Sequence, residues 1–168
     1  MSHVIVYLVG MPGAGKSVVG RELAGRLGVP FVDLDSEIER RAGASVSEIF
    51  AQEGEAAFRA REAAALVDAS AQDPAVVACG GGVVLEPANR ITLRNTGVAV
   101  YLDVPLEALR ERVRPAEDRP LIRGTGDLER LLADRESLYR EFAGHVVDGT
   151  AAPGDVADAI VEELRWSA

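Results

Sequence analysis

Two patterns of apolar residues alternate along this chain. Short continuous apolar runs rich in valine, such as Val4–Val9 and Val76–Cys79, are typical of strands that are buried on both faces of a parallel sheet. Between these runs, apolar residues recur every three or four positions, which places them on one face of a helix. The runs predict strands at Val4–Val9, Phe31–Leu34, Val76–Cys79, Val98–Leu102 and His145–Val147.

Helix signals fill the segments between the runs. Gly28 can end the first helix, and Ser36 can cap the second. Ser45 followed by Glu48 has the spacing of a capping box, and the alanine-rich stretch after it is expected to break near Gly54. The predicted helices are Lys16–Leu27, the turn after Ser36 as far as Ala42, Ser45–Ala71 with its break, Pro87–Asn95, Pro105–Val113, Asp127–Phe142 and Asp155–Arg165.

Strands that alternate with helices in this way pair in parallel through right-handed crossovers. We therefore expect one α/β domain over residues 1–168, with a central five-stranded parallel sheet and helices on both faces in three layers. The segment Arg114–Gly126 is charged, rich in proline and glycine, and has no clear periodicity. Its length favours a mobile lid over a plain connection.

Composition narrows the function classes. The 168 residues are 48% hydrophobic, which is enough for a core, and the net charge of −9 argues against nucleic-acid or anionic-membrane binding. Cys79 is the single cysteine, so no disulfide forms within the chain. The first residues lack the basic region of a signal peptide, and the run Val4–Val9 is too short to span a bilayer. We expect a cytoplasmic monomer.

The segment Gly10–Ser17 matches the phosphate-loop pattern G-x-x-x-x-G-K-[ST], with a predicted strand before it and a predicted helix after it. Its glycines let backbone N–H groups surround a phosphate, and the following helix adds its positive N-terminus. Lys16 is expected to reach the β- and γ-phosphates and Ser17 to bind Mg²⁺. The alternative is a glycine-rich turn without a ligand. The expected nucleoside triphosphate contacts of the loop are Gly13, Ala14, Gly15, Lys16, Ser17 and Val18.

Many phosphate-loop proteins hold magnesium partly through an aspartate at the end of an apolar strand. Here the run Val76–Cys79 ends in three glycines and carries no acid, so Asp33 and Asp35 are the best candidates. In extended backbone both aspartates point to one face, which can hold Mg²⁺ at one depth and a substrate hydroxyl at the next. The alternative is that both simply cap the next helix.

Several arginines accompany these motifs. Arg59 and Glu62 stand three residues apart on a predicted helix, and from these residues alone a surface ion pair is the favoured interpretation. Gly80–Gly82 removes side chains at a strand end, where a ligand can approach the backbone. Arg119 lies in the expected lid, and Arg135 shortly precedes Leu138 and Tyr139.

Taken together and in order, these motifs resemble the shikimate kinase family over essentially the whole chain. The phosphate loop alone is generic, whereas the ordered set is specific. The set consists of the phosphate loop with GRELA, DLD, FRAREAAAL at Phe58–Leu66, GGG, RPLI at Arg119–Ile122, RESLY at Arg135–Tyr139 and VDGTAAPGDVADAI at Val147–Ile160.

The family transfers the γ-phosphoryl group of ATP to the 3-hydroxyl of shikimate, on a phosphate-loop NTPase fold like that of nucleoside monophosphate kinases. The resemblance implies ATP as co-substrate, one Mg²⁺ ion per subunit, a shikimate-binding region at about 33–62 and a lid at about 114–126. It implies that Lys16, Asp33 and Arg119 act in catalysis, and that Asp33 lies near Mg²⁺ and the attacked hydroxyl. Arg112 is implied to lie beside adenine, with Arg110 and Arg114 left open as alternatives, and Pro153 to pack on the base.

The resemblance also assigns the acceptor site. Asp35 would bind the ring hydroxyls of shikimate, while Arg59 and Arg135 would hold its carboxylate in the planar, bidentate way that suits arginine. The other implied substrate contacts are Glu62, which would orient Arg59, the Gly81 N–H with Gly80 and Gly82 beside it, and an apolar wall of Phe50 and Phe58.

The chain departs from the usual family pattern at a few positions. Val18 replaces a small hydroxyl residue, and Ala78 and Cys79 offer little to a water shell around Mg²⁺. Ala151 and Ala152 stand where many members have a polar or basic residue near adenine. Two alternative functions remain, a related kinase for another small polyol acid such as gluconate and a non-catalytic nucleotide-binding module.

Overall fold

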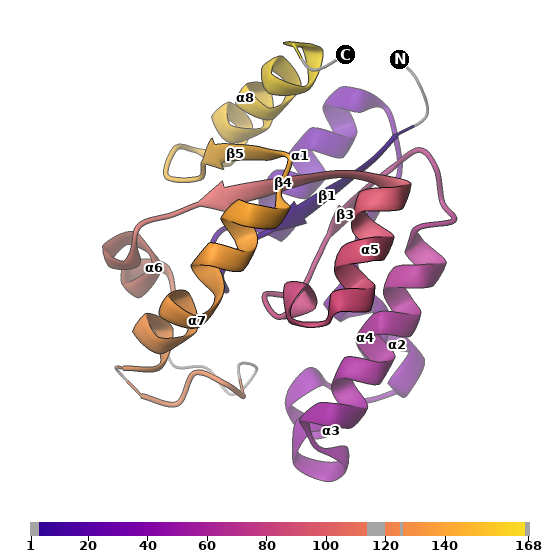
Figure 1. The fold of residues 1–168 in the computed structure, drawn as a ribbon, viewed down its shortest axis with the longest axis vertical. Coiled ribbons are helices and arrows are strands. Elements are labelled where there is room, and N and C mark those ends of the chain that lie inside the picture. Colours follow the sequence, from indigo (N-terminus) through magenta and orange to yellow (C-terminus); the bar gives the residue numbers. More distant parts are fainter. Residues whose placement is uncertain (1–3, 114–119, 125, 167–168) are drawn as a thin grey trace.

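The computed structural model describes residues 4–113, 120–124 and 126–166. Its centre is a five-stranded sheet in the order β2-β3-β1-β4-β5, and every pair of neighbouring strands is parallel (Figure 1). All five residues of β1 are buried, which agrees with its continuous apolar sequence. The strands are β1 (Ile5–Val9), β2 (Phe31–Asp33), β3 (Ala75–Ala78), β4 (Gly97–Asp103) and β5 (His145–Asp148).

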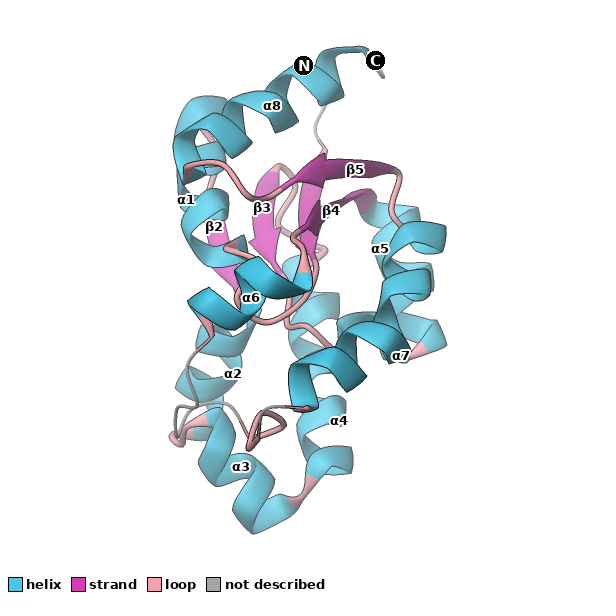
Figure 2. Ribbon diagram, turned by 90° about the vertical axis from the view of Figure 1, so that its left-hand side faces the viewer, coloured by secondary structure: helices cyan, strands magenta, loops and turns pink. Residues whose placement is uncertain are grey.

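Helices cover both faces of the sheet, as the alternation of strands and helices predicts. In Figure 2, α1 lies on one side of the sheet and α5 and α7 lie on the other, while α2, α3 and α4 extend below it. The helix α8 packs against α1. The α-helices are α1 (Lys16–Leu27), α2 (Leu34–Ala42), α3 (Val46–Glu53), α4 (Glu55–Ala69), α5 (Pro87–Thr96), α6 (Leu106–Arg112), α7 (Asp127–Phe142) and α8 (Pro153–Trp166), and Val83–Leu85 forms a short 3₁₀ turn, η1.

The predicted boundaries agree with the structure to within three residues. The capping box at Ser45 is confirmed: the Glu48 N–H donates to Ser45 Oγ at 3.1 Å, and the Ser45 N–H donates to Glu48 Oε2 at 2.8 Å. The break at Gly54 separates α3 from α4. The last helix begins at Pro153 and not at Asp155, because proline is tolerated in the first turn of a helix.

The prediction for the two aspartates was wrong in its backbone geometry. The strand ends at Asp33, and α2 begins at Leu34, so Asp35 lies in the first helical turn and not in extended chain. Asp33, not Ser36, is the N-cap, and its Oδ1 accepts the Ser36 N–H at 3.1 Å. A carboxylate here satisfies one of the free N–H groups at the helix start, which explains why the strand stops.

The expected lid at Arg114–Gly126 lies largely outside the described residues, and Arg119 is among the residues that are not described. Within the described ranges, no helix is long and apolar enough to cross a membrane.

Candidate active site

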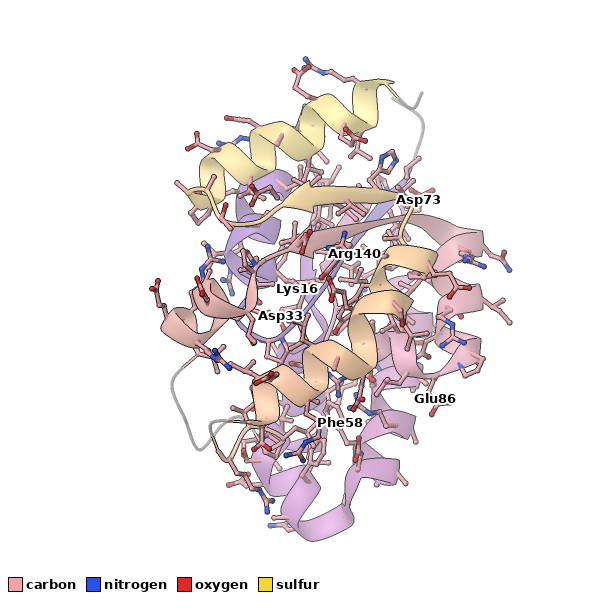
Figure 3. All side chains as sticks on the ribbon, turned by 60° about the vertical axis from the view of Figure 1, so that its left-hand side comes forward. Lys16, Asp33, Phe58, Asp73, Glu86 and Arg140 are labelled. Carbon is pink, nitrogen blue, oxygen red and sulfur yellow. The ribbon has the colours of Figure 1, made fainter. Side chains whose placement is uncertain are left out.

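A cavity of about 500 Å³ opens at the carboxyl ends of the strands, between the phosphate loop and the helices α2, α4 and α7. Figure 3 marks Lys16 and Asp33 near one another close to the sheet, and Phe58 further towards α3. The cavity brings together residues from distant parts of the chain. The predicted site residues that line it are Gly13, Gly15, Lys16, Ser17, Val18, Asp33, Asp35, Phe50, Phe58, Arg59, Glu62, Gly80, Gly81, Gly82, Arg112 and Arg135.

The segment Gly10–Ser17, here called the donor end, is shaped mainly by its backbone. Gly13 and Gly15 have φ angles of 84° and 91°, in the region that side-chain-bearing residues rarely adopt. The Lys16 ammonium donates to the carbonyl oxygens of Gly10 at 2.6 Å and Met11 at 3.0 Å, so its charge lies over the curl of the loop. Helix α1 starts at Lys16 and turns its N-terminus to the cavity, which favours an anionic ligand.

Ser17 and Asp33 form the candidate magnesium site. The Ser17 hydroxyl donates to Asp33 Oδ2, which brings a hydroxyl oxygen and a carboxylate oxygen together beside the loop. Among the described residues, no group of three or more histidine, cysteine, aspartate and glutamate side chains could hold a metal by itself. Such a sparse oxygen set fits Mg²⁺, which keeps several waters and takes further ligands from substrate phosphates.

Asp35, Arg59, Glu62, Gly80–Gly82 and Arg135, here called the acceptor end, bury several charges. The Glu62 side chain is 0% exposed, and the Arg59 side chain is 11% exposed. The Arg59 guanidinium donates to Glu62 Oε1 at 2.9 Å and to Glu55 at 3.3 Å. The surface ion pair that the residues alone favoured is therefore wrong, because α4 turns this pair towards the cavity.

Some polar atoms of the acceptor end lack partners. In the described part of the chain, Asp35 Oδ1, Glu62 Oε2 and Arg59 Nε are buried without a hydrogen bond. Burial raises the pKa of Asp35, and the nearby charge of Lys16 opposes that rise. Burial also raises the pKa of Glu62, and the charge of Arg59 opposes it. Unsatisfied groups of this kind are costly, so they point to a polar ligand or to water.

The three glycines allow these charged side chains to approach the backbone. A Cβ atom on Gly80 would lie 2.8 Å from Glu62 Oε2 and 3.0 Å from Asp35 Oδ1. A Cβ atom on Gly82 would lie 2.4 Å from the guanidinium nitrogens of Arg59. Arg135, which is 4% exposed, approaches the middle glycine from α7. The two arginines thus reach the same loop from α4 and α7.

An aromatic pair completes the acceptor end. Phe50 of α3 and Phe58 of α4 have ring centroids 4.9 Å apart, and both line the cavity. The Arg59 guanidinium lies 5.3 Å from the centroid of the Phe58 ring, so the wall also supports the arginine.

At the opposite end of the cavity, Arg112 donates to the carbonyls of Gly149 at 3.0 Å and Thr150 at 3.3 Å. Arg110, one of the alternatives for the adenine contact, pairs with Glu129 instead and does not line the cavity. The alternative Arg114 lies outside the described residues. Ala14 is buried and Pro153 is exposed, and neither lines the cavity.

The sequence prediction missed several residues of the site. Glu39 and Val46 line the cavity and were not predicted to do so. Cys79, which was expected near the magnesium site, lines it as well, and burial raises the pKa of its thiol. Tyr139 donates its hydroxyl to the Gly81 carbonyl from 58 residues away. The motif around Arg135 contains Tyr139, but no local spacing indicates which carbonyl a buried tyrosine will reach.

Comparison with known proteins agrees with this geometry. The family model described as Shikimate kinase matches residues 12–165. The chain belongs to the shikimate kinase family. Curated shikimate kinases from Halorhodospira halophila and Aromatoleum aromaticum are 49% and 50% identical to it over 164 and 166 residues, covering 95% and 96% of this chain and 93% and 95% of theirs.

Solved structures of shikimate kinases share the fold. The shikimate kinase from Acinetobacter baumannii, whose structure is a complex with shikimate, superposes with a TM-score of 0.95 at 38% identity, covering 99% of this chain and 95% of that one. A gluconokinase from Sinorhizobium meliloti reaches a TM-score of 0.59 at 19% identity, with 98% and 97% covered, which shows the fold alone. The predicted phosphate-loop NTPase-like fold is therefore confirmed.

Proposed function

We propose that this protein is a shikimate kinase that transfers the γ-phosphoryl group of ATP to the 3-hydroxyl of shikimate, giving 3-phosphoshikimate and ADP on the route to chorismate and the aromatic amino acids. One observation carries the proposal. In a chain of this family, the phosphate loop lines the same cavity as the buried Glu62 carboxylate and the two arginines whose charges act on it, Arg59 and Arg135. Such a cavity suits a triphosphate at one end and a small hydroxylated carboxylate at the other.

At the donor end, the backbone of Gly13–Gly15 and the Lys16 ammonium bind the phosphates in this proposal. Ser17 and Asp33 hold one Mg²⁺ ion, which supplies neutralisation of phosphate charge when it is bound. Asp33 Oδ1 also accepts a hydrogen bond from the Ser36 N–H, so the orientation of this carboxylate is set before any ligand binds. Its part in the reaction is to align the attacked hydroxyl, because phosphoryl transfer depends mainly on position and charge neutralisation.

At the acceptor end, Asp35 accepts hydrogen bonds from the ring hydroxyls through its unpartnered Oδ1. Arg59 and Arg135 bind the carboxylate from two sides, and Glu62 fixes one face of Arg59. The loop Gly80–Gly82 presents backbone N–H groups, and the ring lies over Phe50 and Phe58. Planar, charge-assisted bonds of this kind make arginine better suited than lysine to a carboxylate.

The remaining assignments are proposed on the family pattern. Val18 lies at the rim of the donor end, and Arg112 contacts the adenine side of ATP. Pro153 would pack on the base, and Arg119 would reach the phosphates from a lid at about 114–126. We also propose a single kinase domain over residues 1–168 that works as a cytoplasmic monomer, with the acceptor bound mainly by residues 33–62.

A panel of acceptors tests this function. ADP release is measured with ATP and Mg²⁺ in the presence of shikimate, gluconate or no acceptor. We expect turnover that depends on shikimate. Turnover with gluconate and none with shikimate would support the alternative kinase, and nucleotide binding without acceptor-dependent turnover would support a non-catalytic module.

A further inference from the structure

Each of the three carbonyl groups of the loop Gly80–Gly82 accepts a hydrogen bond from another group of the protein. The Val83 N–H donates to Gly80 O, and the Leu85 N–H donates to Gly82 O, each at 3.1 Å and within the turn that follows. The carbonyl of Gly81 accepts instead from the Tyr139 hydroxyl of α7. With its carbonyls occupied in this way, the loop can offer N–H groups to an anionic ligand.

Tyr139 is a rigid support for this contact. Its side chain is 0% exposed, and its ring stacks on Tyr101 of β4, with centroids 5.0 Å apart and planes 20° apart. Burial raises the pKa of Tyr139 to about 12, so the hydroxyl stays protonated and can donate across the physiological range. The ring cannot turn away without disturbing the packing of α7 on the sheet.

The contact sets the direction of the next peptide group. The Gly81–Gly82 peptide is trans, so its carbonyl and its N–H point to opposite sides. Because the carbonyl points to Tyr139, the N–H points away from α7. Gly82 itself approaches Arg59, since a Cβ there would lie 2.4 Å from that guanidinium.

The same tyrosine is close to the second arginine. The charge of Arg135 acts on the Tyr139 hydroxyl and opposes the effect of burial on its pKa. Arg135 Nη1 would lie 3.3 Å from a Cβ on Gly81, while Pro12 of the donor end would lie 3.0 Å away. The Gly81 peptide is therefore located where the donor end, the acceptor end and α7 meet.

We propose that Tyr139 is a positioning residue for the acceptor, whose hydroxyl holds the Gly81 peptide so that the loop and Arg135 keep one orientation towards the substrate carboxylate. This role rests on the proposed function. It makes Tyr139 act through Gly81 and Arg135, without touching the substrate itself.

The test replaces Tyr139 by phenylalanine, which keeps the ring and removes the donor. We expect kcat/KM for shikimate to fall by about tenfold, mostly through KM, because one buried carbonyl loses its partner. KM for ATP should stay within about twofold, since the variant leaves the phosphate loop intact. The matched control is Tyr7→Phe, which also removes a tyrosine hydroxyl. That hydroxyl forms a 2.7 Å hydrogen bond with Thr96, and neither residue lines the cavity.

The control should lose stability but keep the wild-type parameters for both substrates. Wild-type kcat/KM for shikimate in Tyr139→Phe would overturn the proposal. Equal losses for shikimate and ATP, matched by Tyr7→Phe, would also overturn it, because they would indicate a general structural effect. A double-mutant cycle with Arg135→Lys should show a combined loss smaller than the product of the two single losses.

Should Tyr139→Phe fail to fold, the unmodified enzyme still answers the question. The chain has three tyrosines, so tyrosine that carries carbon-13 only at the ring carbon bearing the hydroxyl gives three NMR signals, one per residue. Saturating shikimate should shift the Tyr139 signal and leave that of Tyr7 in place; an unmoved Tyr139 signal counts against the proposal. Absence of shikimate turnover in the wild type would instead reject the proposed function.

Discussion

The donor and acceptor ends of the cavity are built in opposite ways. The donor end is eight consecutive residues, Gly10–Ser17, and most of its ligand-binding groups belong to the backbone. The acceptor end takes side chains from α2, α4 and α7 around one glycine loop, and it buries their charges. A backbone site depends on local chain geometry, whereas a site of buried charges depends on how distant elements pack. Damage to one end should therefore leave the other largely intact.

The largest effect is expected from Lys16→Ala. Removing this charge should lower kcat by roughly 10²–10³, because stabilisation of charge on the transferred group dominates such reactions. Shikimate affinity without nucleotide, measured by calorimetric titration, should change little. A comparable collapse of shikimate affinity would show that the two ends are not separate.

The next largest effect is expected from Arg59→Lys. Loss of the planar charge-assisted contact should weaken shikimate binding by about 10- to 100-fold, because one such hydrogen bond contributes ~1.5–3 kcal/mol. ATP binding should persist. Arg61→Lys is the matched control, because Arg61 lies on the same helix but pairs with Glu53 through two 3.0 Å bonds outside the cavity. Unchanged shikimate affinity in Arg59→Lys, by titration, refutes the carboxylate contact.

A smaller effect is expected from replacing a glycine by alanine, and it should differ between a crowded glycine, Gly82, and an open one, Gly25. In Gly82→Ala the new methyl group meets the Arg59 guanidinium at 2.4 Å, so we expect about a tenfold rise in KM for shikimate. In Gly25→Ala, within α1, the methyl group meets nothing within 4 Å, and stability should rise by about 0.5–1 kcal/mol with activity unchanged. Steady-state kinetics and thermal unfolding measure both. An unchanged KM in Gly82→Ala would mean that Arg59 moves aside freely.

The smallest effect concerns pH and stability. Burial raises the pKa of Glu62 above its unfolded value, so the folded state binds more protons than the unfolded state between these two pKa values. Stability should therefore fall as pH rises from the unfolded pKa of about 4.5 through the folded pKa. Glu62→Gln should flatten that fall in unfolding measurements across pH. Parallel curves for the two proteins would contradict a raised pKa at Glu62.

Much of the fold could be predicted because its signals are local. The helices Lys16–Leu27 and Asp127–Phe142 have the predicted bounds, and the capping box at Ser45 is present. The end of β2 was misplaced by one residue, because whether Asp33 extends the strand or caps the helix depends on the next turn. Such competition between two local structures cannot be settled by hydrophobic pattern alone.

The sequence by itself determined the strand–helix alternation and the phosphate loop, since both depend on residues close together in the chain. Only the tertiary structure decided that Arg59 and Glu62 form a buried pair, because burial depends on which face of α4 meets the loop Gly80–Gly82. It also decided that Tyr139 reaches the Gly81 carbonyl. Contacts between residues that are tens of positions apart arise from packing, and the periodicity of apolar residues along the chain does not predict them.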